Sequence, residues 1–142
     1  SSNPAKTGEA KALGAHHVVD SRDAAAVKKL AGSLSFILVT ANVALDWDAY
    51  LAALAPRGRL HFVGAVLTPV PVAAFTLIGG QKSVAGSPLG SPATTTRMLD
   101  FCARHKIAAV TEDFPLSRIN DALARLRSGK ARYRIVLTND LR

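Results

Sequence analysis

The chain has 142 residues, of which 49% are hydrophobic, so it has enough apolar side chains for a folded core and is not expected to be disordered. Its single cysteine excludes an intramolecular disulfide framework and suits a reducing cytoplasm. The formal net charge of +8 either serves solubility or indicates an anionic partner, which would be nucleic acid or a phosphate-bearing small molecule.

No apolar stretch is long enough to span a bilayer, and the small, polar N-terminus does not resemble a signal peptide. We therefore expect no membrane partner and a cytoplasmic location. The only methionine is Met98, so the sequence does not start at an initiation codon. We expect it to be a trimmed or processed piece of a longer protein.

The first predicted elements are a helix and a short strand. Ser2 or Asn3 is suited to cap a helix over residues 4–13, whose first residue is a favourable Pro and whose end is marked by Gly14. The run HHVVD, residues 16–20, predicts a short strand. These two elements begin an alternation of helices and strands.

A second helix and a second strand follow. Asp23 is suited to cap the helix, which turns Val27 inward and ends at Gly32. The continuous apolar run over residues 34–40 contains β-branched side chains. Such a run predicts a strand that is buried on both faces of a sheet.

A third helix is predicted after Asp46, a good N-cap residue. Its apolar residues follow helical spacing and form one stripe, made of Trp47, Tyr50, Leu51 and Leu54. The segment PRG closes this helix, and residues 59–64 predict the next strand. The β-α-β-α-β pattern predicts a parallel sheet joined by right-handed crossovers.

The strict alternation loosens after Gly64. Residues 65–75 predict an extended loop containing Pro, residues 75–81 a helical turn, and residues 82–87 a strand at a sheet edge. Ser91 is suited to cap a further helix that begins with Pro. One face of this helix carries Met98, Leu99 and Cys102.

The C-terminal part predicts a short strand or extended segment at residues 110–116, an amphipathic helix at residues 117–129 and a final strand at residues 132–138. Gly129 is suited to end the helix. The residues predicted to face inward are Ile119, Ala122, Leu123 and Leu126.

Few residues have the spacing of a catalytic or metal site. No Cys/His cluster, GxSxG, P-loop or GxGxxG motif occurs. His16 and His17 are better explained by strand-edge packing than by catalysis, His61 by a hydrogen-bonded imidazole in the core, and His105 by the favourable end of a helix. Cys102 is better explained as a small core residue than as a nucleophile.

Residues 1–6, SSNPAK, have the chemistry of a phosphate-binding turn. In dinucleotide-binding sheets, the residue that ends the second strand contacts the adenosine ribose. Hydroxyl groups, a helix N-terminus and a cation such as Lys6 would favour a 2′-phosphate there. Taken alone, however, these six residues favour the simpler interpretation of a helix N-cap with a solvated Lys6.

Four motifs in order resemble the medium-chain, zinc-dependent alcohol dehydrogenases, and among these the cinnamyl-alcohol-dehydrogenase-like, NADP-preferring branch. They are SSNPAK followed by EAKALGAHHVVDS, then DWDAYLAALAPRGRLHFVG, GGQKSVAGSPLGSPATTTRMLDFCARH and INDALARLRSGKARYRIVL. The resemblance covers essentially the whole chain, but only the later part of the family's sequence. The family's zinc ligands and Gly-rich turn lie upstream of the matched part.

This resemblance implies an α/β fold with a doubly wound parallel sheet. Residues 1–93 would form an incomplete Rossmann-type, NADP-binding domain. Residues 94–142 would form a C-terminal α/β appendage that packs on the catalytic domain in the family.

The resemblance also implies which residues contact the cofactor. Ser1, Ser2 and Lys6 match the family's 2′-phosphate contacts, and Asn3 stands where a third Ser is common. Late in the chain, Arg134 matches an Arg near the pyrophosphate. The remaining contacts are Thr40 and Ala41 beside the cofactor, Val63 and Gly64 at the nicotinamide, and Gly86, Ser87 and Pro88 on the carboxamide side. Arg132 lies close to Arg134 in the sequence, but a surface role for it is expected at least as much as a cofactor contact.

The function implied is the cofactor-binding portion of a zinc enzyme that transfers hydride between NADPH and an aldehyde or primary alcohol. None of its catalytic or metal residues would lie in this chain, so we expect the isolated chain to be inactive. The alternative is a non-catalytic nucleotide-binding or dimerisation module.

The sequence also bears on two kinds of macromolecular partner, a second copy of the chain and nucleic acid. The edge strand at residues 82–87 matches the segment that pairs in the family's dimers, and exposed strand edges invite such pairing. Nucleic-acid binding through the basic residues 125–134 is disfavoured, because Tyr133 is their only aromatic residue and the run ends in a predicted core strand.

Overall fold

The computed structural model describes residues 6–141, and the chain divides into two compact units between Leu89 and Gly90. Each unit contains a parallel sheet with helices, so the predicted α/β class is confirmed. No helix among residues 6–141 is long and apolar enough to cross a membrane.

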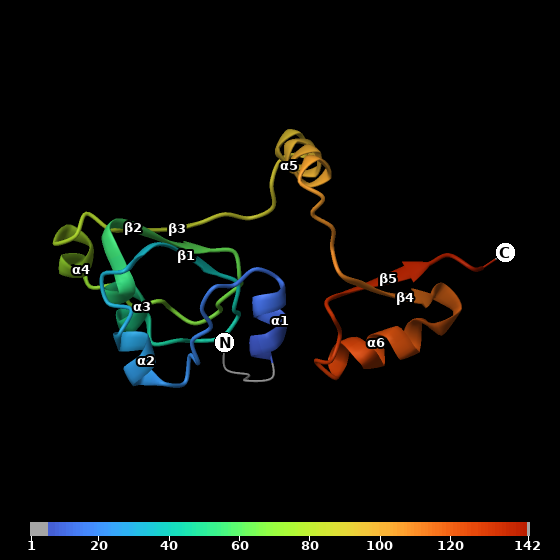
Figure 1. The fold of residues 1–142 in the computed structure, drawn as a ribbon, viewed down its shortest axis with the longest axis horizontal. Helices are drawn as coiled ribbons and strands as arrows, with labels where there is room; N and C mark the ends of the chain where they lie inside the picture. The colour runs from blue at the N-terminus through green and yellow to red at the C-terminus, as the bar shows by residue number, and fades with distance from the viewer. Residues whose placement is uncertain (1–5, 142) are drawn as a thin grey trace. The chain divides into compact units, whose positions relative to one another are not determined.

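The first unit contains a three-stranded sheet (Figure 1). Its strands lie in the order β1-β2-β3, and both neighbouring pairs are parallel. The elements in chain order are α1 (Lys6–Ala12), α2 (Ala24–Lys28), β1 (Leu34–Val39), α3 (Trp47–Ala53), β2 (Leu54–Phe62), α4 (Ala74–Ile78) and β3 (Ser83–Gly86).

The predicted caps at Asp23 and Asp46 are confirmed, whereas that at Ser2 or Asn3 lies outside the described residues. Asp23 accepts a hydrogen bond from the backbone N–H of Ala26 at 3.0 Å, and Asp46 accepts one from Ala49 at 3.2 Å. Gly14, which follows α1, has a positive φ of 100°, a conformation that side chains with a Cβ rarely adopt. These bonds and this turn involve residues close in sequence, which is why the sequence predicted them.

The core of the first unit lies between α3 and one face of the sheet. Its buried side chains are Val39, Trp47, Leu51, Leu54 and Leu60. The Trp47 ring also meets the Phe62 ring edge-on, with their centroids 5.2 Å apart. Trp47 and Leu51 are therefore buried on α3 as predicted, whereas Tyr50 is only half-buried and the buried Leu54 begins β2.

Three predictions about the strands of the first unit are wrong. Residues 16–20 belong to neither sheet of the described chain. The strand β1 is buried on one face only, because Phe36 and Leu38 keep 54% and 52% of their surface exposed. Finally, β2 starts at Leu54 and continues through the predicted turn, with an irregular register between its first and second pairs with β1.

The continuation of β2 through the predicted turn depends on the backbone at Arg57 and Gly58. Arg57 adopts a positive φ of 61° inside β2, and its N–H donates to the carbonyl oxygen of Gly80 at 2.7 Å. A Cβ on Gly58 would lie 2.8 Å from the carbonyl oxygen of Ala55. The segment therefore makes a tight bend without leaving the strand, and a tertiary hydrogen bond holds that bend.

The second unit contains a two-stranded parallel sheet, and a helix connects the two strands along the chain (Figure 1). Ser91 caps α5 through the N–H of Thr94 at 3.2 Å, as predicted. The elements are α5 (Pro92–Arg104), β4 (Thr111–Pro115), a 3₁₀ turn (Leu116–Arg118), α6 (Ile119–Arg127) and β5 (Arg134–Thr138).

The apolar faces of α5 and α6 are less buried than predicted. On α5, Met98 and Leu99 are at least half exposed, and Cys102 is half-buried. On α6, only Ala122 of the four predicted inward residues is buried. The other three line a shallow apolar hollow of about 180 Å³ together with two residues of β5: Ile119, Leu123, Leu126, Ile135 and Leu137.

Candidate functional site

The three strands of the first unit end level with one another. Val39 at the end of β1 pairs with Phe62, and Phe62 at the end of β2 pairs with Gly86 at the end of β3. In open parallel sheets, ligands bind outside this carboxyl edge. The predicted contact residues that follow the strand ends at this edge are Thr40 and Ala41, Val63 and Gly64, and Ser87 and Pro88.

Backbone hydrogen bonds hold the loops at this edge. The N–H groups of Val63 and Gly64 both donate to the carbonyl oxygen of Val39, at 3.0 and 2.9 Å. The N–H of Ser87 donates to the carbonyl oxygen of Phe62 at 3.1 Å. The first residues of two loops are thus fixed by the neighbouring strand.

Gly64 lies in direct backbone contact with the loop that follows β1. A Cβ at this position would lie 2.8 Å from the carbonyl oxygen of Thr40, and nearer still to that of Ala41. Real Cβ atoms do not approach backbone atoms so closely. The two loops meet here only because residue 64 is Gly.

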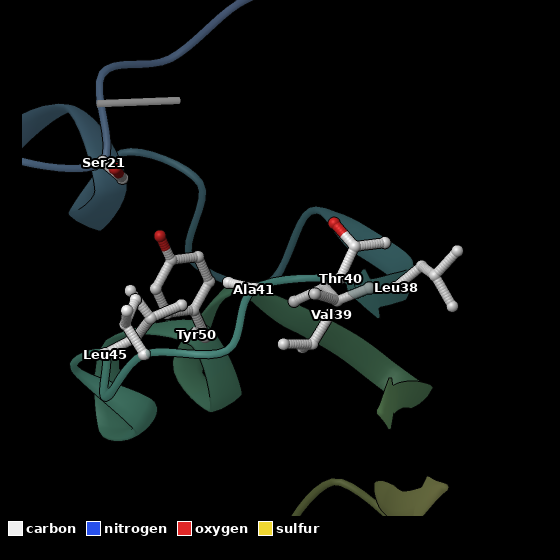
Figure 2. Close-up of a pocket in the computed structure, with 9 residues that line it drawn as sticks. Ser21, Leu38, Val39, Thr40, Ala41, Leu45 and Tyr50 are labelled. Carbon is white, nitrogen blue, oxygen red and sulfur yellow. The ribbon is translucent and has the colours of Figure 1, made fainter. Parts of the chain in front are cut away.

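A cavity of about 320 Å³ opens beside the end of β1 (Figure 2). Its lining is mostly apolar, with hydroxyl groups from Ser21, Thr40 and Tyr50. Figure 2 shows the Tyr50 ring pointing toward the turn that carries Ser21. The lining residues are Ser21, Ile37, Leu38, Val39, Thr40, Ala41, Val43, Leu45 and Tyr50.

Sequence reasoning did not include Ser21, Val43, Leu45 or Tyr50 among the contact residues. Tyr50 fits the inward stripe of α3 equally well as a plain core residue. The signal available in the sequence was the hydroxyl group of Tyr50, because a buried Tyr hydroxyl usually needs a hydrogen-bond partner. Burial, and to a lesser extent the nearby Asp46 carboxylate, raises the pKa of the Tyr50 phenol.

His61 lies on β2 and reaches the loop that follows β3. Its Nε2 is 2.9 Å from the Oγ of Ser87, a hydrogen-bond distance. The ring centroid lies 6.3 Å from that of Phe36 on β1. The prediction of a hydrogen-bonded imidazole within a strand is confirmed, whereas His16 and His17 are exposed and lie on no strand.

The predicted 2′-phosphate contacts fall mostly outside the described residues. Ser1, Ser2 and Asn3 precede residue 6, the first that the structure describes. Lys6 is the first residue of α1 and is exposed.

The predicted phosphate contact Arg134 belongs to the second unit. It begins β5, and its N–H donates to the carbonyl oxygen of Val110 at 3.2 Å. The guanidinium of Arg132 lies 5.8 Å from the centre of the Tyr133 ring. Arg132 and Arg134 are thus neighbours at one end of the two-stranded sheet.

Glu112 on β4 holds the loop that leads to these two Arg residues. Its carboxylate accepts hydrogen bonds from Nε and Nη2 of Arg125 at 2.8 and 3.0 Å, and from the N–H of Arg132 at 2.7 Å. These bonds, with that from the Arg125 side chain the strongest, lower the pKa of the Glu112 carboxyl. Sequence reasoning missed Glu112, because its partners lie 13 and 20 residues away.

The described residues do not fit a zinc site. Among residues 6–141, no group of three or more His, Cys, Asp or Glu side chains is close enough to hold a metal ion.

Comparison with known proteins identifies relatives over nearly the whole chain. The model of the family described as "Zinc-binding dehydrogenase" matches residues 1–104. An aldehyde reductase, AdhA, of Synechocystis sp. is 48% identical over 138 residues, which are 97% of this chain and 41% of the relative. Cinnamyl alcohol dehydrogenase 7 of Oryza sativa subsp. japonica is 38% identical over 138 residues, which are 96% of this chain and 36% of the relative.

Solved structures show the same fold. A cinnamyl alcohol dehydrogenase of Sorghum bicolor matches 96% of this chain and 39% of its own, with a TM-score of 0.87 and 38% identity. A cinnamyl alcohol dehydrogenase of Helicobacter pylori, solved in complex with NADP(H), matches 96% of this chain and 39% of its own, with a TM-score of 0.77 and 28% identity.

This chain spans about two fifths of the length of the curated relatives that it matches. The matched part includes the Rossmann-type parallel sheet described above. The family model and the relatives agree over most of the chain, and the chain therefore belongs to the zinc-binding dehydrogenase family.

Proposed function

We propose that this chain is the NADP-binding portion of a zinc-dependent alcohol dehydrogenase that acts on an aldehyde or a primary alcohol. Family membership supports this proposal, as do relatives named aldehyde reductase and cinnamyl alcohol dehydrogenase. The complex of the Helicobacter pylori enzyme with NADP(H) supports the choice of cofactor.

The observation that carries the proposal is the contact between Gly64 and the loop after β1. Because residue 64 has no side chain, the loops after β1 and β2 can pack backbone against backbone at the carboxyl edge. The same edge carries the open cavity beside Thr40 and Tyr50. A mostly apolar cavity next to this backbone contact suits a dinucleotide that lies along the edge.

The residues of this chain would bind and orient the cofactor. NADPH supplies a hydride from its nicotinamide ring when bound. Val63, Gly64 and the loop over residues 86–88 would position that ring. Pro88 lacks an N–H, so it can offer only its carbonyl oxygen and its ring surface there.

The other end of the cofactor would lie nearer to α1. The exposed cation of Lys6, together with Ser1, Ser2 and Asn3, would bind the 2′-phosphate and distinguish NADPH from NADH. Arg134 would contribute positive charge toward the pyrophosphate. The zinc ligands would come from parts of the protein outside this sequence, and the chain alone would be inactive.

The edge position of β3 supports a further part of the proposal. Within the described sheet, β3 pairs with β2 on one side only. A second copy could pair with the other side at residues 82–87 and form a homodimer. The same observation favours a second candidate function, a non-catalytic dimerisation or nucleotide-binding module.

Titration of the chain with NADPH and NADH tests the first proposal. We expect NADPH to bind more tightly, and we expect Lys6→Ala to lower its affinity about tenfold while NADH affinity stays unchanged. Lys11→Ala on the same helix is the matched control and should leave both affinities unchanged. Absence of NADPH binding, together with a stable dimer in sedimentation, would instead support the module.

A further inference from the structure

The contact between His61 and Ser87 connects the middle strand of the sheet with the loop after β3. Nε2 of His61 lies 2.9 Å from Oγ of Ser87. The N–H of Ser87 is also bonded to the carbonyl oxygen of Phe62 at 3.1 Å. Ser87 is therefore held at two points, one on its backbone and one on its side chain.

The alternation of side chains along β2 explains why His61 can reach Ser87. Leu60 points into the core and is buried, so His61 points to the opposite face of the sheet. On that face its direct neighbour on β3 is Ala85, and Ser87 follows two residues later. A long side chain can reach this diagonal position across parallel strands.

We infer that His61 is a positioning residue for the cofactor, because its imidazole holds the Ser87 hydroxyl and so fixes the loop that receives the nicotinamide end of NADPH. This inference rests on the proposed function. His61 itself is not a catalytic residue, since it acts through Ser87. A fixed loop binds more tightly because it loses less conformational freedom when the ligand arrives.

A second pair on the same face provides a matched control. Nε of Arg59 lies 3.4 Å from Oγ of Ser83, and these two residues are direct partners across β2 and β3. This pair resembles the His61 pair but lies toward the amino end of the strands. Its removal should not affect the loop at the carboxyl edge.

The experiment compares variants of the 142-residue chain by two measurements. The first is the rate of amide hydrogen exchange at Ser87 without any ligand. The second is the affinity for NADPH and for adenosine 2′,5′-bisphosphate, which carries the 2′-phosphate but no nicotinamide. The variants are His61→Leu, His61→Asn, Ser87→Ala, the double variant His61→Leu with Ser87→Ala, and Arg59→Leu.

We expect His61→Leu to speed exchange at Ser87 and to weaken NADPH binding about threefold to tenfold, the range of one neutral hydrogen bond. Its affinity for the bisphosphate should stay unchanged. His61→Asn, which keeps a side-chain N–H, should restore part of the loss. In the double variant the two losses should not add, because both remove the same contact. Arg59→Leu should leave the Ser87 exchange rate and the affinity for both ligands unchanged.

Two results would overturn the inference, and they can be told apart. If the wild-type chain binds NADPH and His61→Leu leaves that affinity and the Ser87 exchange rate unchanged, His61 does not position the loop. If the wild-type chain binds no NADPH, the proposed function fails and the cofactor role of His61 fails with it, whatever happens to the exchange rate.

Discussion

Gly64 lies so close to the carbonyl oxygen of Ala41 that no side chain could be accommodated between them. This contact joins the loops after β1 and β2 at the carboxyl edge of the sheet. The N–H of Gly64 also donates to the carbonyl oxygen of Val39 and so holds the loop after β2 against the end of β1. The contact and the hydrogen bond together determine the shape of the candidate site.

Gly64→Ala is expected to destabilise the first unit by about 1–3 kcal/mol, because a Cβ would push the two loops apart. Urea unfolding followed by Trp47 fluorescence measures this change, since Trp47 is the only Trp and lies in the core. Gly8→Ala is the control, because a Cβ added to Gly8 in α1 would meet no atom within 4 Å. It should be neutral or slightly stabilising. Equal unfolding midpoints for Gly64→Ala and the wild type would contradict the prediction.

Glu112→Gln is expected to reduce the pH dependence of the stability of the second unit in acid. The folded-state pKa of Glu112 is lowered by its bonds from Arg125 and Arg132, so it lies below the unfolded value. Its contribution is therefore present above the unfolded pKa and is lost as the pH falls through the folded pKa. The free energy of unfolding of the wild type and of the variant, compared from neutral pH to about pH 3, tests this prediction. Parallel curves for the two proteins would contradict it.

Ser117→Ala is expected to raise the pKa of Asp140 toward its ordinary value. The Asp140 carboxylate accepts hydrogen bonds from the Ser117 hydroxyl at 2.6 Å and from the Ser117 N–H at 2.9 Å, and the side-chain bond is the larger cause of its lowered pKa. Carboxyl titration by NMR measures the shift. Ser128→Ala, whose hydroxyl donates to the carbonyl oxygen of Arg125, should leave the Asp140 titration unchanged.

Asp46→Ala is expected to destabilise the first unit by about 1 kcal/mol, through loss of the α3 cap. It should also lower the pKa of Tyr50 in part, because burial remains the larger cause of the raised value. Tyrosinate absorbance in a Tyr133→Phe background isolates Tyr50, since the chain has two Tyr residues. Asp23→Ala removes a similar cap from α2 and should leave the Tyr50 titration unchanged. Equal effects of both variants on Tyr50 would contradict the prediction.

The order of the elements could be predicted from the sequence, as could the edge position of β3. The caps at Asp23, Asp46 and Ser91 were also predictable, because each cap depends on residues three positions apart. The strand predicted at residues 16–20 failed, because strand formation depends on a neighbour that is not local.

The candidate site also combines features that the sequence predicted with features that it did not predict. The residues after the three strand ends were predicted from the family resemblance to contact the cofactor, and the structure brings them to one edge, because parallel strands end together there. The cavity beside Tyr50 was not predictable, because it depends on how the turn at Ser21, the end of β1 and α3 pack against one another. The contact between His61 and Ser87 depends on pairing between β2 and β3, so the sequence alone predicted only that the imidazole would find some partner.

The sequence by itself determined the family, the parallel α/β class and the caps, because these depend on local spacing and on ordered motifs. Only the tertiary structure decided that Gly64 must lack a side chain, that Phe36 remains half exposed, and that Glu112 holds the N–H of Arg132. The physical reason is that these three features depend on atoms that are brought together, or left uncovered, only when distant segments pack.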